Sequence, residues 1–112
     1  MYWMILLVLD DPERLQEILD AWEQAGVRGA TIIESTGLYR VRRAFIPMRY
    51  AAALSAPEEG HLTLLAIVAG EAQARQGLQA AESVLGDLDG PDTGVFAAWP
   101  LGLVKGLPQQ EV

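Results

Sequence analysis

The sequence predicts an α+β domain of the ferredoxin-like type. In this βαββαβ sandwich, a four-stranded antiparallel sheet carries two helices on one face. Two observations favour it: a strand, helix, strand order that occurs twice, and a length of 112 residues, which suits one domain. A small parallel α/β fold is the alternative, but two helices are few for covering both faces of a parallel sheet. We therefore expect residues 1–112 to form a single domain.

The first half of the chain reads as strand, helix and strand. Residues 2–9 (YWMILLVL) are a continuous apolar run of strand length. Asp11 and Pro12 then supply a helix N-cap and a proline at the first helical position. Apolar residues follow at helical spacing opposite an acidic face, and Gly26 ends this pattern: Leu15, Ile18, Leu19 and Trp22. Residues 30–36 (ATIIEST) are β-branched and short, which predicts a second strand.

The second half repeats this order without a clear sequence identity to the first. Residues 61–69 (HLTLLAIVA) predict a third strand, and we expect His61 at its start to lie on the surface. A second helix begins at Glu71 and ends at Gly86, and its predicted apolar face consists of Ala74, Leu78, Ala81 and Leu85. A turn-rich loop leads to the last strand, residues 95–99.

The first and third strands lack a polar alternation, so both faces of the sheet are predicted to be apolar. Two helices on one side can cover only one of these faces. Monomeric proteins rarely leave a large apolar surface exposed. We therefore expect the other face to be buried by copies of the same chain in an oligomer.

Composition excludes several classes of function. The chain has no cysteine and one histidine, which leaves no disulfide, no thiolate nucleophile and little for a metal site. A net charge of −7 argues against general nucleic-acid binding. Every apolar run is shorter than the roughly 18 residues that a membrane span needs, so we expect a cytoplasmic protein. No nucleophile, acid–base or dinucleotide motif indicates an enzyme.

One short stretch, residues 37–50 (GLYRVRRAFIPMRY), is strongly basic and holds four of the eight basic residues of the chain. Aromatic residues and methionine stand between its arginines, a composition typical of protein interfaces. The connection from Gly37 to Gly60 is also longer than most, which favours a function. We expect contact with a protein partner, while subunit packing and an anionic membrane surface stay open. The expected docking residues are Arg42, Arg43, Phe45, Met48, Arg49 and Tyr50.

The segment GATIIESTGLYR (29–40) resembles the PII signal-transduction family: a glycine and a short strand precede Gly37 and Arg40, which open a long excursion. The order of elements also fits along the whole chain. The resemblance implies a non-enzymatic regulatory homotrimer whose sheets face inward. It further implies that the excursion, at about 37–60, is a T-loop that docks onto a transporter or an enzyme. Adenine nucleotides would bind as small-molecule effectors in clefts between subunits.

The resemblance also implies a set of ligand-binding residues: Gly37, Tyr39, Arg40, Asp92, Thr93, Gly94 and Lys105. Two departures from the family pattern bear on this set. Val41 stands where the family has a glutamine, which weakens the case for 2-oxoglutarate sensing. The family's Gly-Asp-Gly-Lys aligns with residues 91–94 (PDTG), so its lysine is absent among several aspartates. ATP, ADP or AMP is the implied ligand, and a less charged ligand stays open.

Two other classes of protein also fit the sequence. A dimeric α/β-barrel enzyme would share the elements and would hold a pocket between sheet and helices. A trimeric structural module of the CutA type would share the fold and ignore nucleotides. Oligomer mass and the response to nucleotides distinguish these classes from a PII-like regulator.

Overall fold

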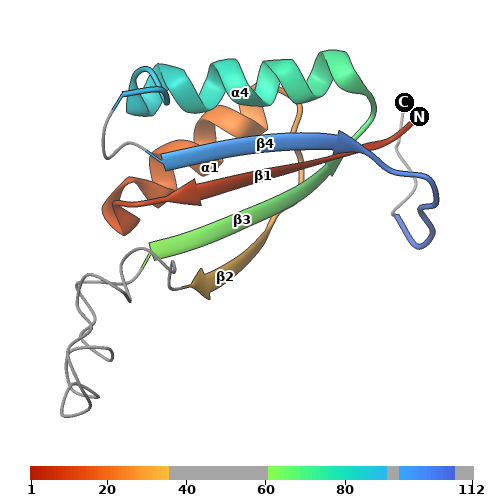
Figure 1. The fold of residues 1–112 in the computed structure, drawn as a ribbon, viewed down its shortest axis with the longest axis horizontal. Coiled ribbons are helices and arrows are strands. Elements are labelled where there is room, and N and C mark those ends of the chain that lie inside the picture. Colours follow the sequence, from red (N-terminus) through yellow and green to blue (C-terminus); the bar gives the residue numbers. More distant parts are fainter. Residues whose placement is uncertain (36–60, 91–93, 108–112) are drawn as a thin grey trace, which may run out of the picture.

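The computed structural model describes residues 1–35, 61–90 and 94–107. In these ranges the chain forms a four-stranded antiparallel sheet with two α-helices on one face, so the predicted fold class is confirmed (Figure 1). The elements are β1 (Trp3–Leu9), α1 (Leu15–Gln24), β2 (Thr31–Ser35), β3 (His61–Val68), α4 (Glu71–Leu85) and β4 (Gly94–Pro100).

The strand order β2-β3-β1-β4 brings several chain segments to one end of the sheet. Leu9, the last residue of β1, pairs with Leu62 in β3 and with Gly94 in β4. At the same end, Ser35 of β2 pairs with His61. The last residue of β2 and the first residues of β3 and β4 therefore lie at the same end of the sheet as the last residue of β1, on the left side of Figure 1.

The first helix starts one turn later than its proline. The Asp11 side chain accepts a hydrogen bond from the Glu13 backbone N–H at 3.0 Å, and Pro12–Arg14 form a 3-10 turn before α1 begins at Leu15. Ile18 and Trp22 of the predicted apolar face are buried, and Leu15 and Leu19 pack against the core. The periodicity of the sequence was therefore sufficient to place this helix and its buried side.

The buried face of α4 differs by one position from the prediction. Ala74 and Ala81 are buried as expected, but Gly77 takes the place between them and Leu78 is only half-buried. A Cβ at Gly77 would lie 3.0 Å from the Ile5 side chain. The missing side chain therefore lets this turn of the helix approach the sheet closely.

The core fills the layer between the sheet and the helices. Its largest fully buried side chains are Trp22, Ile5, Leu7, Leu9, Ile18 and Leu64. His61 is also buried, at 7% exposure, although a surface position was expected. The alternation of β3 places His61 on the face opposite the helices, where it is more deeply buried than Ile67 of the same strand, which is 36% exposed.

Candidate functional site

The sheet face opposite the helices is apolar and uncovered in the described chain. Alternate residues of β1 point there, beginning with Met4, and the pairing registers place further apolar residues beside them: Leu65, Ile67, Val95, Ala97, Trp99 and Ile33. Val95 is 57% exposed, Ile33 46% and Trp99 40%. The prediction that both sheet faces are apolar is confirmed, and this face is a candidate surface for contact with other copies of the chain.

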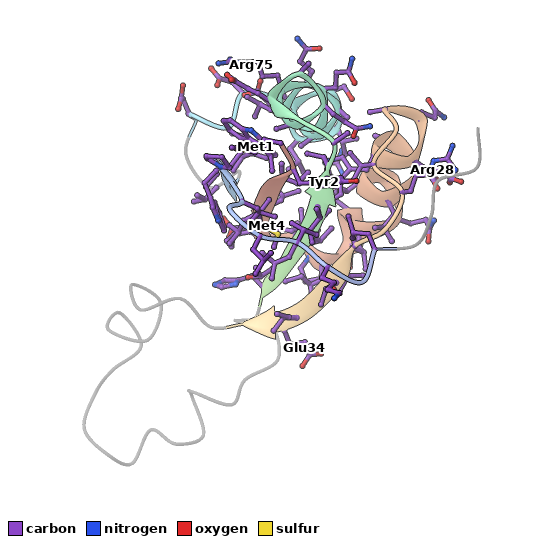
Figure 2. The ribbon with its side chains drawn as sticks, turned by 90° about the vertical axis from the view of Figure 1, so that its right-hand side faces the viewer. Met1, Tyr2, Met4, Arg28, Glu34 and Arg75 are labelled. Atoms are coloured by element: carbon purple, nitrogen blue, oxygen red, sulfur yellow. The ribbon has the colours of Figure 1, made fainter. Side chains whose placement is uncertain are left out.

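The edge strand β2 extends beyond the helical layer. Its residues Thr31, Ile32, Ile33 and Glu34 are all exposed. In Figure 2, Glu34 projects from this strand away from the body of the domain. As an edge strand, β2 also leaves a row of backbone N–H and C=O groups that can pair with another chain.

Gly94, one of the expected ligand-binding residues, is the first residue of β4 and has a φ of 138°. A Cβ added here would clash with the Val8 carbonyl oxygen, well inside the 3.0 Å that real Cβ atoms keep. Only glycine fits this position of the strand pair. The lysine that the resemblance would place at this position is therefore incompatible with the backbone.

Lys105, a second expected ligand-binding residue, is exposed in the segment that follows β4. That segment starts at the opposite end of the strand from Gly94 (Figure 1). A strand of this length, seven residues, spans roughly 20 Å. One chain therefore does not bring Gly94 and Lys105 together, and a common site needs Lys105 from another copy.

The other expected site residues lie outside the described residues. This holds for the ligand-binding set Gly37, Tyr39, Arg40, Asp92 and Thr93, and for the docking set Arg42, Arg43, Phe45, Met48, Arg49 and Tyr50. Their flanking residues are described. Ser35 and Gly94 both lie at the sheet end where β1 finishes, but on opposite edges of the sheet, because β3 and β1 stand between β2 and β4.

The loop after α4 is closed by hydrogen bonds within the protein. Gly86 has a φ of 87° and ends the helix, as predicted. The Leu88 N–H donates to the Glu82 carboxylate at 3.0 Å, and the Asp89 N–H donates to the Asp87 carboxylate at 2.9 Å. The Gly90 N–H donates to the Asp87 carbonyl at 2.9 Å. Three successive backbone donors thus have acceptors in the same chain.

Sequence reasoning missed two residues that shape this end of the fold, Glu82 and Arg14. The Arg14 guanidinium donates to the Val84 carbonyl in the last turn of α4 at 2.6 Å and also pairs with Glu17. It therefore links the start of α1 to the helix end that leads into the loop. No local pattern could reveal this contact, because its partners are 70 positions apart in the chain.

Residues 1–35, 61–90 and 94–107 contain neither a cluster of metal-ligand side chains nor a helix that could span a membrane. Within these ranges, no group of three or more histidine, aspartate or glutamate side chains could hold a metal ion. Neither α1 nor α4, the α-helices of the same ranges, is long and apolar enough to cross a membrane.

No family model and no curated protein matches the chain. Solved structures, however, match the fold of the chain. GlnK of B. subtilis matches over 90% of this chain and 85% of its own, with a TM-score of 0.61 and 13% identity. The PII protein of Arabidopsis thaliana, bound to citrate, matches over 89% of this chain and 77% of its own, with a TM-score of 0.62 and 14% identity. At such low identity the likeness concerns the fold, and the chain has the PII-like ferredoxin fold, far diverged in sequence.

Proposed function

We propose that this chain is a non-enzymatic, PII-like regulatory protein that works as a homotrimer. It binds a small effector between subunits and docks a protein partner, a transporter or an enzyme, through the basic segment 37–50. The observation that carries the proposal is the uncovered apolar sheet face in a chain of this fold. The expected place of action is the cytoplasm.

The trimer is supported by the energetics of the open face. Fully burying one large aliphatic or aromatic side chain stabilises a complex by about 1.5–3 kcal/mol. Val95, Trp99, Ile67 and Ile33 are each more than a third exposed on this face. A contiguous apolar surface of this kind is typical of an interface.

The effector site is proposed where subunits meet at the loop end of the sheet. Residues 37–40 follow β2 at the same end as Gly94, and Lys105 comes from a neighbouring copy because it lies beyond the far end of β4. The candidate effectors are ATP, ADP and AMP. Contact between the effector and Arg40 selects one conformation of the segment above it, which presents or hides the docking residues. Such a population shift needs different effector affinities for the two conformations.

One sample tests the proposal, with mass from light scattering and stability from a thermal-shift series. ATP, ADP, AMP, adenosine, 2-oxoglutarate and bicarbonate are added in turn, because a ligand of the native state raises the melting temperature. A trimer that an effector stabilises supports the proposal, and a monomer refutes it. For an anionic effector, Arg40→Ala is expected to weaken binding by about 1.5–3 kcal/mol in calorimetry.

A structural trimer of the CutA type is the second candidate, and the closed loop after α4 favours it. Leu88, Asp89 and Gly90 offer their backbone N–H groups to acceptors of the chain itself. A trimer whose stability no effector changes would select this candidate. The barrel-enzyme alternative has less support, because Trp22, Leu7 and Leu9 fill the layer between sheet and helices.

A further inference from the structure

We propose that the loop of residues 86–90, together with Gly94, forms a wall of the effector site that excludes phosphate. The effector presents an uncharged or cationic group to this wall, and any phosphate it carries points elsewhere. This inference rests on the proposed function for the existence of the site. The exclusion itself is a property of the described loop and can be tested separately.

The backbone donors of this loop are already occupied. Phosphate binds in protein loops where successive backbone N–H groups point at it. In this loop the Leu88 N–H is taken by the Glu82 carboxylate, and the Asp89 N–H by the Asp87 carboxylate. The Gly90 N–H is taken by the Asp87 carbonyl. A phosphate could gain these donors only by displacing acceptors that are already in place.

The loop also carries two negative charges, on Asp87 and Asp89. Both residues are exposed, so a phosphate that approaches the loop meets two carboxylates. Like charges a few ångströms apart repel by about 1 kcal/mol even in bulk water. Arg14, the basic residue seen at the end of α4, is already bound to Val84 and Glu17. It therefore does not compensate for the two carboxylates.

The backbone at position 94, where β4 begins next to Leu9, leaves no room for a side chain. With a φ of 138° and the Val8 carbonyl in the space of a Cβ, this position cannot carry a lysine or an arginine without moving the strand. A cationic side chain at position 94 is thus excluded by the backbone. The negative charge of the wall, its occupied backbone donors and the backbone at position 94 all favour an effector that presents an uncharged or cationic group here.

The test compares the wild-type protein with Asp87→Asn/Asp89→Asn. Asparagine keeps a side-chain oxygen, so the bond that position 87 accepts from the Asp89 N–H is retained while two charges are removed. Tripolyphosphate, ATP and adenosine are titrated into each protein by calorimetry, and the backbone amide signals of residues 88–90 are followed by NMR. Gln79→Ala, an exposed change on the outer side of α4, serves as the control variant.

We expect the double variant to bind tripolyphosphate and ATP about tenfold more tightly than the wild type, with shifts at residues 88–90. The affinity for adenosine should stay equal, and the control should behave as the wild type. Equal polyphosphate affinity in the wild type and the double variant, including no binding by either, would overturn the proposal. A different outcome separates this inference from the proposed function. If the double variant binds tripolyphosphate more tightly than the wild type but neither protein binds adenosine, the exclusion of phosphate stands and the proposed function fails.

Discussion

The conformation of Gly94 leads to a stability prediction that can be worked out from the structure. Replacing this glycine by alanine places a Cβ on a backbone with a φ of 138°, against the carbonyl oxygen of Val8. A non-glycine residue in such a region costs about 1–3 kcal/mol from backbone strain alone. The clash adds to this, because β4 must move away from β1 at the Leu9 pair. We expect Gly94→Ala to lower the free energy of unfolding by about 3 kcal/mol or more.

Two other glycines provide matched controls for this change. Gly86 also has a positive φ, 87°, but a Cβ there meets nothing within 4 Å, so Gly86→Ala should cost only about 1 kcal/mol. Gly29 has open space as well and no positive φ, and Gly29→Ala should be neutral or stabilise by up to about 1 kcal/mol through the unfolded chain. The three variants therefore separate the free-energy cost of backbone strain from that of the steric clash with Val8.

The assay is urea unfolding followed by tryptophan fluorescence, since Trp22 is buried at 1% exposure and reports on the core. All variants are measured at one protein concentration, because association adds to stability by mass action. A Gly94→Ala protein as stable as Gly86→Ala would refute the reasoning. It would show that the start of β4 relaxes freely and that position 94 could accept a larger residue.

Three further changes test other parts of the structure. Trp99→Lys should convert the proposed trimer to a monomer in light scattering while circular dichroism shows an intact fold, because Trp99 lies on the uncovered face. Gln79→Lys, the control, should have the same mass as the wild type. Arg14→Ala removes the contact between the start of α1 and the end of α4. Chemical unfolding should show a loss of about 1 kcal/mol, since this side chain is partly exposed. Trp22→Phe removes the buried hydrogen bond from the indole N–H to the Gly77 carbonyl and should lower the free energy of unfolding by about 1 kcal/mol or more. A smaller loss would show that this bond contributes little to the contact between α1 and α4.

The sequence by itself determined the elements and their order. Trp22 and the three apolar residues before it repeat at helical spacing, so the helix and its buried side follow from the pattern. Gly26 and Gly86 ended their helices as predicted, and both have a positive φ that glycine adopts without strain. The continuous apolar run of β1 indicated a central strand with two apolar faces, which the register of the sheet confirmed.

Only the tertiary structure decided which residues meet across the fold. His61 is buried although no local pattern indicates it, and Gly77 is buried because its turn of α4 lies against the Ile5 side chain. Gly94 was expected only as a ligand-binding residue, and its pairing with β1 is what places the Val8 carbonyl against it. Local patterns record the periodicity of helices and strands, whereas these contacts depend on how distant segments pack. The apolar open face was therefore predictable from the sequence, and the closed loop beside it was not.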